Sequence, residues 1–246
     1  MTTRPTPEQL LLIDDNRQNL RLTRFLLESD GFSVQTAESA EEAFTLLIRL
    51  RFCLILVDIQ LPGMDGLEFT RRVRGTPEWS QLPIVALTAY AMRGDEERML
   101  SAGCDGYMSK PIDTRTFSAT VRGYLTVRMD RSAHPDGGAR DQKARIHENF
   151  EDLVPEYLTE RRAEARDLEE MLAGGKFGEI RTIAHNLKGS GSSYGFPGLT
   201  ELGEQLTIAA RVGDRTAAEA VVVNLRVLLE RLKPPLRAAM NSSPRN

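Results

Sequence analysis

Cysteine is scarce in this sequence. The chain has two cysteines, Cys53 and Cys104, and neither lies in a CxxC pair or near a histidine cluster. Two cysteines without such motifs give no sign of a disulfide framework and no candidate structural zinc site. A low cysteine content of this kind is typical of proteins from a reducing compartment.

Long apolar runs and a large excess of charge are also missing. No segment approaches the roughly 18 apolar residues that a membrane span needs, and the opening segment "MTTRPTPEQ" lacks the apolar core of a signal peptide. We therefore expect a cytoplasmic protein with no direct membrane insertion. The formal net charge is −3, so the composition predicts no nucleic acid partner.

Nucleotide-binding motifs are absent as well. The sequence contains neither GxxxxGK[ST] nor a glycine-rich DxGxG pattern, so we expect no phosphorylation of the chain by itself from ATP. Lysine is much rarer than arginine, which draws attention to any lysine that lies inside a motif.

Five apolar segments alternate with amphipathic helical segments in the first half of the chain. The 246 residues are 41% hydrophobic, which is enough for two domains. Strand–helix alternation with strongly apolar strands predicts an α/β fold of the flavodoxin-like (βα)5 type, with a parallel five-stranded sheet covered on both faces. The predicted strands are residues 9–13, 32–37, 52–58, 82–89 and 106–111.

The second half contains no strand signal. A polar segment rich in glycine, proline and charge, residues 128–144, is predicted to be a flexible linker. Four helical patterns with short connections follow it and predict an antiparallel four-helix bundle. These helices are residues 150–172, 177–189, 199–213 and 215–232. We therefore expect one domain at 8–127 and a second at 145–240.

Polar side chains gather at the carboxyl ends of the predicted strands, where doubly wound sheets carry their chemistry. Because three carboxylates at one edge repel one another, a hard divalent cation such as Mg²⁺ is expected among them. A lysine there can hold a phosphate oxygen, and a threonine can donate to another. The pattern favours phosphoryl transfer to a carboxylate. The residues are Asp14 and Asp15 after the first strand, Asp58 after the third, Thr88 at the fourth and Lys110 at the fifth.

Residues 8–127 resemble a response-regulator receiver domain. The resemblance rests on the five-unit alternation and on "DD", "LVDIQLPGMDG", "LTA" and "KP" at successive strand ends. It implies that Asp58 is the phosphoacceptor. It also implies that Asp15, Asp58 and the Gln60 carbonyl bind Mg²⁺ directly, with Asp14 acting largely through water. Thr88 and Tyr107 would form the switch pair, and a cis peptide bond would precede Pro111.

The stretch "AHNLKGSGSSYG" in the second half combines a histidine, a lysine and several glycines. Apolar residues of this helix, Ile180, Ile183, Ala184 and Leu187, follow the spacing of a core stripe. His185 lies off the stripe and is expected to face solvent, with Lys188 and Gly189 on the same side. Glycine is disfavoured in helices by roughly 1 kcal/mol, so bare backbone beside the imidazole indicates close approach by another protein.

This arrangement resembles the histidine phosphotransfer (HPt) domain, whose motif is HxxKG, over residues 145–240. The resemblance implies that Nε2 of His185 carries a phosphoryl group, supported by Lys188 and Gly189, and that the domain has no catalytic activity of its own. Together the two resemblances predict a phosphorelay intermediate. Its expected partners are a sensor histidine kinase, or another phosphohistidine donor, and a downstream receiver protein.

Two alternatives use the same residues. In the first, the protein is a phosphate sink: His185 drains a shared pathway and Asp58 loses the group to water. In the second, the receiver switches a protein-interaction surface and His185 carries nothing.

Overall fold

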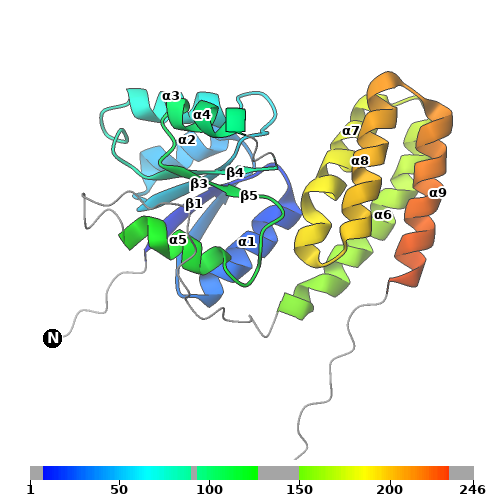
Figure 1. Cartoon of the computed structure of the whole chain (residues 1–246), viewed down its shortest axis with the longest axis horizontal. Coiled ribbons are helices and arrows are strands. Elements are labelled where there is room, and N and C mark those ends of the chain that lie inside the picture. The colour runs from blue at the N-terminus through cyan, green and yellow to red at the C-terminus, as the bar shows by residue number, and fades with distance from the viewer. Residues whose placement is uncertain (1–7, 90–92, 127–149, 233–246) are drawn as a thin grey trace, which may run out of the picture. The chain divides into compact units, whose positions relative to one another are not determined.

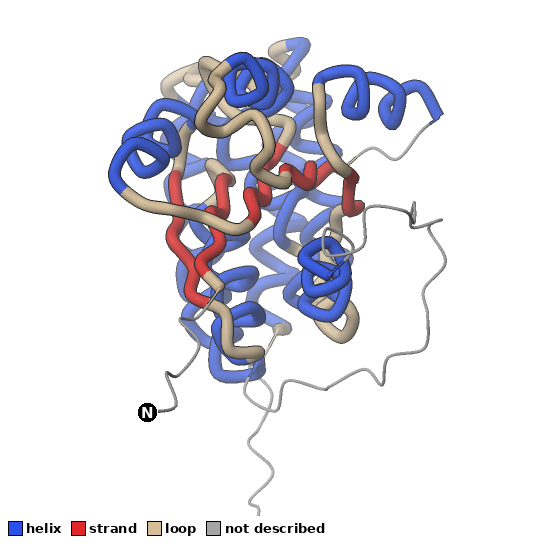
Figure 2. Tube along the Cα trace, turned by 90° about the vertical axis from the view of Figure 1, so that its left-hand side faces the viewer, coloured by secondary structure: helices blue, strands red, loops and turns tan. Residues whose placement is uncertain are grey.

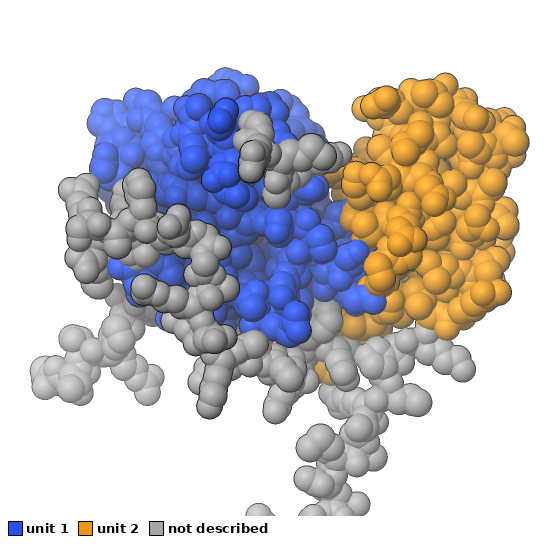
Figure 3. All heavy atoms as spheres, viewed as in Figure 1, with its two compact units in different colours: residues 1–147, 189–195 blue, residues 148–188, 196–246 orange. Residues whose placement is uncertain are grey.

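The computed structural model describes residues 8–89, 93–126 and 150–232. The chain divides into two compact units, residues 1–147 with 189–195 and residues 148–188 with 196–246 (Figure 3). The predicted linker, residues 128–144, lies outside the described residues. Each unit is described by itself below.

The first unit is built on a five-stranded parallel sheet of order β2-β1-β3-β4-β5 (Figures 1 and 2). This confirms the predicted α/β class. Every residue of β3 and β4 is buried, as expected for strands with helices on both faces. The strands are β1 (Gln9–Ile13), β2 (Ser33–Ala37), β3 (Leu54–Asp58), β4 (Ile84–Thr88) and β5 (Gly106–Ser109).

Within residues 8–89 and 93–126, five helices cover this sheet. Figure 1 shows α1 and α5 on one face and the other three on the opposite face. The predicted fifth strand ran to Pro111, but β5 ends at Ser109, which agrees with the lack of an N–H on Pro111 for the strand ladder. The helices are α1 (Arg17–Ser29), α2 (Ala40–Arg49), α3 (Gly66–Gly75), α4 (Arg93–Ala102) and α5 (Phe117–Thr126).

The strand order decides where chemistry can occur. β1 pairs in parallel with β2 on one side and with β3 on the other, so the direction of winding reverses between β1 and β3. A crevice forms at the carboxyl ends of the strands at such a switch point. Asp14 follows β1 directly and Asp58 ends β3, so both residues lie at this crevice.

In the second unit, residues 150–232 form four α-helices, which confirms the predicted helical half. They are α6 (Val154–Ala173), α7 (Phe177–Ser190), α8 (Pro197–Val212) and α9 (Arg215–Arg231), preceded by the short 3-10 turn η2 (Phe150–Leu153). The end of α7 and a second 3-10 turn, η3 (Ser192–Tyr194), fall in residues 189–195, which group with the first unit. The first helix was predicted from residue 150 but begins at Val154. Pro155 then lies in the first turn, where its missing N–H costs no helical hydrogen bond.

In the described ranges, no helix is both long enough and apolar enough to cross a membrane.

Candidate functional sites

An acidic cluster lies at the switch point of the sheet. Asp14, Asp15 and Asp58 each offer a carboxylate oxygen, and these oxygens lie within 4.8 Å of one another. Asp14 is only 1% exposed and Asp58 only 4% exposed. The structure therefore brings together the three acids that the sequence placed at the ends of the first and third strands.

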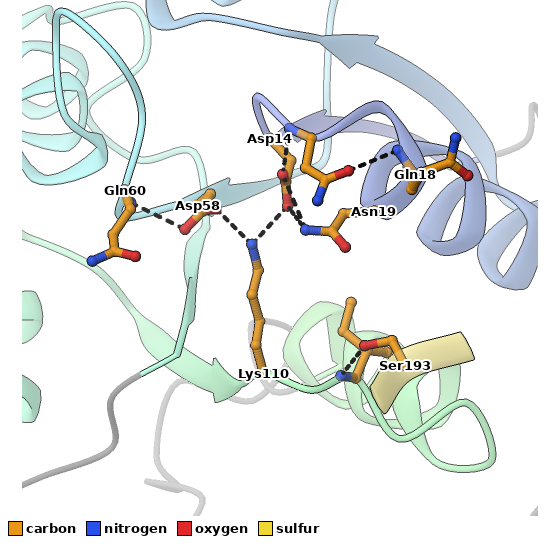
Figure 4. A network of polar contacts seen from close by, with 9 residues as sticks. Asp14, Gln18, Asn19, Asp58, Gln60, Lys110 and Ser193 are labelled. Carbon is orange, nitrogen blue, oxygen red and sulfur yellow. Dashed lines mark hydrogen bonds and ion pairs between the residues drawn. The ribbon is translucent and has the colours of Figure 1, made fainter. Parts of the chain in front are cut away.

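Lys110 joins two of these acids. Its Nζ donates to Asp14 Oδ2 at 2.7 Å and to Asp58 Oδ2 at 2.5 Å (Figure 4). The Lys110 side chain is 7% exposed, so its charge is compensated by these carboxylates rather than by bulk water. The peptide bond between Lys110 and Pro111 is cis, as the resemblance implied.

Burial and charge act against each other in this cluster. Burial raises the pKa of Asp14 to about 6, and repulsion from Asp58 adds to the rise although Lys110 opposes it. Burial alone would lower the pKa of Lys110, but the two carboxylates outweigh it and raise that pKa. Lys110 therefore stays charged at neutral pH, whereas Asp14 holds its negative charge less firmly than an exposed aspartate does.

The donor set fits a hard divalent cation. Three carboxylates meet one ammonium, so one of the three negative charges is offset and an excess remains. Carboxylate oxygens are the ligands that Mg²⁺ takes in proteins, and the ion commonly keeps water and phosphate as its other ligands.

Two asparagines complete the surroundings of Asp14, and the sequence analysis missed both. Asn16 donates its backbone N–H to Asp14 Oδ1 at 2.9 Å. Asn19 Nδ2 lies 3.3 and 3.2 Å from the two carboxylate oxygens of Asp14 (Figure 4). Asn16 is also the N-cap of α1 and accepts from Gln18 N. An asparagine just before a helix is a recognisable capping signal, and it could have placed the helix start beside Asp14.

The loop after β3 holds the backbone of Asp58 closely. Gln60 donates its backbone N–H to Asp58 Oδ1 at 3.0 Å. Gly66 begins α3, and a Cβ added to it would lie 2.2 Å from the Asp58 carbonyl oxygen, a distance that no side chain tolerates. Asp65 caps the same helix by accepting from Glu68 N at 2.7 Å. Glycine at position 66 is thus required for the start of α3 to contact the aspartate.

Thr88 and Tyr107 lie on the neighbouring strands β4 and β5. Thr88 is buried at the end of β4, beside a cleft of about 280 Å³ that is also lined by Gln60 and Met99. Tyr107 is partly buried against the core. The Glu96 carboxylate on α4 raises the pKa of the Tyr107 hydroxyl through its charge, burial adds to the rise, and a hydrogen bond joins the two side chains.

His185 lies in the middle of α7 in the second unit. Ile180, Ala184 and Leu187 are buried as the stripe predicted, whereas Ile183 is only partly buried. His185 was expected to face solvent and is partly buried. Gly189 lies in the last turn of α7, so this glycine falls within the helix.

Helix α8 contacts the His185 turn through two residues that the sequence analysis did not single out. Lys188 Nζ lies 3.0 Å from Glu204 Oε1. A Cβ on the preceding Gly203 would lie 2.5 Å from the Lys188 backbone nitrogen and 2.9 Å from the Ala184 carbonyl oxygen. The two helices therefore touch backbone to backbone on either side of His185. A glycine inside a predicted helix is the signal that could have indicated this close contact.

Comparison with known proteins assigns a family to both halves. Residues 10–122 match the response regulator receiver domain and residues 148–234 match the Hpt domain. The chain is 40% identical over 119 residues to the polar-differentiation response regulator DivK of Brucella anthropi, covering 48% of this chain and 97% of that protein. The DivK protein of Brucella ovis is 40% identical over 118 residues, with 48% and 96% covered.

Solved structures similar to the chain include a putative response regulator from Chloroflexus aurantiacus. It is 30% identical, with a TM-score of 0.47, and the match covers 49% of this chain and 99% of that one. The sequence matches and the geometry of the two halves lead to one assignment. The chain belongs to the response regulators and joins a receiver domain to an Hpt domain, the combination of two-component phosphorelay signalling.

Proposed function

We propose that the protein is an intermediate carrier in a phosphorelay. Asp58 accepts a phosphoryl group from the phosphohistidine of a separate donor, and His185 exchanges phosphoryl groups with Asp58 or with another receiver. The observation that carries this proposal is the pairing of Lys110 with Asp14 and Asp58 in the same chain as an HxxKG helix.

The residues around Asp58 support its role as acceptor. A carboxylate oxygen of Asp58 attacks phosphorus, the P–N bond of the donor breaks, and its electron pair returns to the leaving imidazole. Lys110, now bound to Asp58 Oδ2, would exchange that oxygen for a phosphoryl oxygen. The Thr88 hydroxyl would donate to a second one.

Receiver domains bind Mg²⁺ at an acidic cluster of this kind. We propose that Asp15, Asp58 and the Gln60 carbonyl hold the ion directly, and that Asp14 does so largely through water. When bound, Mg²⁺ neutralises negative charge on the phosphoryl oxygens.

The return step uses the second unit. The Nε2 lone pair of His185 attacks the phosphorus of an aspartyl phosphate, the P–O bond breaks, and its electron pair returns to the carboxylate. The ring keeps its proton on Nδ1. Lys188, three residues along the same helix, would attract the phosphoryl oxygens as a point charge.

Radiolabelled acetyl phosphate tests the proposal. The full chain, Asp58→Ala and His185→Gln are incubated with Mg²⁺, and the label is sorted by stability. Acyl phosphate survives acid and phosphohistidine survives base. We expect base-stable label in the wild type and none in either variant, because Asp58 would feed His185.

Acid-stable label on Asp58 without any base-stable label would contradict exchange within the chain. Two controls sharpen the reading. Chelation of Mg²⁺ should remove the label, and γ-³²P-ATP without a kinase should produce none.

A further inference from the structure

Lys188 has a carboxylate partner close to the position that a phosphoryl group on His185 would occupy. The ammonium lies 3.0 Å from Glu204 Oε1 on α8, with the Lys188 side chain 24% exposed and that of Glu204 57% exposed. His185 and Lys188 are three residues apart on α7, so their side chains lie on the same side of the helix. Lys188 therefore has two anionic groups within its reach once His185 is phosphorylated.

The helix contact beneath this ion pair is a close approach of two backbones. Gly203 precedes Glu204, and a Cβ on Gly203 would meet the Lys188 backbone nitrogen at 2.5 Å and its Cα at 2.9 Å. Backbones in such contact cannot slide without losing their packing. The glycine thus fixes how far the carboxylate of the next residue lies from Lys188, and the ion pair depends on more than two flexible side chains.

Competition for the lysine has a chemical consequence. A phosphoryl group on an imidazole carries up to two negative charges, and an ammonium that donates to it stabilises the phosphohistidine. A carboxylate that holds the same ammonium weakens this stabilisation. The phosphoryl group is then more easily passed to an aspartate.

We propose that Glu204 is a positioning residue of the phosphotransfer site, which holds Lys188 and thereby sets the equilibrium between phosphohistidine and aspartyl phosphate. The inference rests on the proposed function of His185. It assigns Glu204 no contact with the phosphoryl group itself.

The test uses two complementary versions of the full chain. The Asp58→Ala chain is phosphorylated on His185 with radiolabelled phosphoramidate, which transfers its phosphoryl group to the imidazole and releases ammonia. After removal of the reagent, it is mixed with Mg²⁺ and the His185→Gln chain, whose Asp58 is intact. The ratio of base-stable to acid-stable label at equilibrium is the readout.

We expect Glu204→Gln in the phosphorylated chain to shift this ratio toward phosphohistidine by roughly two- to five-fold, the range of an exposed ion pair. Glu204→Asp, which keeps the charge, should return the ratio toward wild type. Glu201→Gln is the matched control, because Glu201 is an exposed glutamate three residues earlier on α8, and it should leave the ratio unchanged.

A double-mutant cycle separates competition from a structural effect. In a Lys188→Gln chain, Glu204→Gln should no longer shift the ratio. An unchanged ratio in the single Glu204→Gln variant, or a shift that persists without Lys188, would overturn the inference while base-stable label still supports the proposed function. Failure of His185 to take any label would overturn both.

Discussion

The two candidate phosphoacceptors are built in opposite ways. Asp58 depends on side chains from the ends of several strands, and Asp14 and Lys110 are 96 residues apart in the sequence. His185 and Lys188 lie on adjacent turns of one helix. Acceptance by a carboxylate requires charges gathered in a buried place, whereas an imidazole needs little more than a fixed backbone and one neighbouring cation.

Burial separates the two sites in a second respect. Lys110 is almost fully enclosed with its acids, whereas the pair of Lys188 and Glu204 is open to water. Removal of one partner from a buried pair leaves a charge that solvent cannot compensate, but an exposed pair contributes little to stability. Mutations should therefore affect folding at the first site and mainly transfer at the second.

Lys110→Met should have the largest effect. Loss of the ammonium leaves Asp14 and Asp58 repelling each other, and we expect the free energy of unfolding of the first unit to fall by about 3 kcal/mol. Trp79 is the single tryptophan of the chain and packs against the core of this unit. Its fluorescence in urea therefore measures the change.

The control for this variant is Lys176→Met. Lys176 forms an exposed ion pair with Glu179 at 3.4 Å, so the loss should be below about 0.5 kcal/mol. Lys176 lies in the second unit, so this loss is measured by the helical circular dichroism signal in urea. Equal losses of stability in the two variants would contradict the idea that burial makes the Lys110 ion pairs more important for folding than an exposed ion pair. Addition of Mg²⁺ should restore part of the stability of Lys110→Met.

Gly66→Ala and Gly203→Ala should come next, each costing about 1–3 kcal/mol through overpacking. The first change pushes α3 away from Asp58, and the second pushes α8 away from the His185 turn. Gly66→Ala should lower the urea midpoint of Trp79 fluorescence. Gly203→Ala should lower the midpoint of the helical circular dichroism signal and leave Trp79 unaffected.

Gly178→Ala provides the matched change in a helix with room for the methyl group. A Cβ at Gly178 would meet nothing within 4 Å, so we expect a gain of up to about 1 kcal/mol from helix propensity. A loss at Gly178 as large as the loss at Gly203 would show that close packing is not the cause.

Glu164→Gln tests buried charge in the bundle. Burial raises the pKa of Glu164 to about 7 from 4.5, although Arg161 opposes the rise. Between these two values the folded protein binds more protons than the unfolded chain, so stability should fall as pH rises from about 4.5 to 7 and then level off. We expect the free energy of unfolding of the wild type to fall by about 1–2 kcal/mol over this pH range. This is less than the full pKa shift corresponds to, because Glu164 is partly exposed.

The measurement for Glu164→Gln is urea unfolding followed by circular dichroism at pH 5 and pH 8. The variant should lose most of the difference between the two pH values. Equal stability of the wild-type bundle at pH 5 and pH 8 would contradict this prediction. It would mean that the ion pair between Arg161 Nη2 and Glu164 Oε1, 2.7 Å apart, keeps Glu164 ionised at both pH values.

The smallest effects are expected at two helix caps. Asp65 accepts from Glu68 N at the start of α3, and Asp214 accepts from Ala217 N at the start of α9. Alanine at either position should cost about 1 kcal/mol. Asp65→Ala should also slow labelling of Asp58, because α3 contacts that residue. Asp214→Ala should leave labelling of both acceptors unchanged.

The fold of both halves and the position of the acidic cluster could be predicted from the sequence. Alternating apolar segments predicted the parallel sheet, and the polar residues at its strand ends predicted the acidic cluster around Asp58. Residues that end strands of a parallel sheet must meet at one edge, so no contact information was needed. The four helices of the second half followed from the helical spacing of their apolar residues, which is also a local property of the sequence.

Contacts between helices could not be predicted from the sequence. Lys188 was predicted to lie on the same side of the helix as His185. Its pairing with Glu204, however, depends on the rotation of α8 against α7, which periodicity does not specify. The close contact at Gly203 and the contact of Gly66 with Asp58 also depend on tertiary packing. A glycine in a pattern marks an exception to local propensity, but the sequence does not say which backbone lies against it.

The separation of Asp14 from Lys110 also bears on how the receiver half acquires its chemistry. Their ion pair closes a loop of almost the whole domain, and closure of long loops is slow because its entropic cost precedes the contacts that repay it. Capacity to accept a phosphoryl group should therefore appear only after the last strand has joined the sheet. In a refolding experiment, labelling of Asp58 would therefore report when the last strand joins the sheet. The circular dichroism signal of the helices should pass its midpoint before this labelling appears.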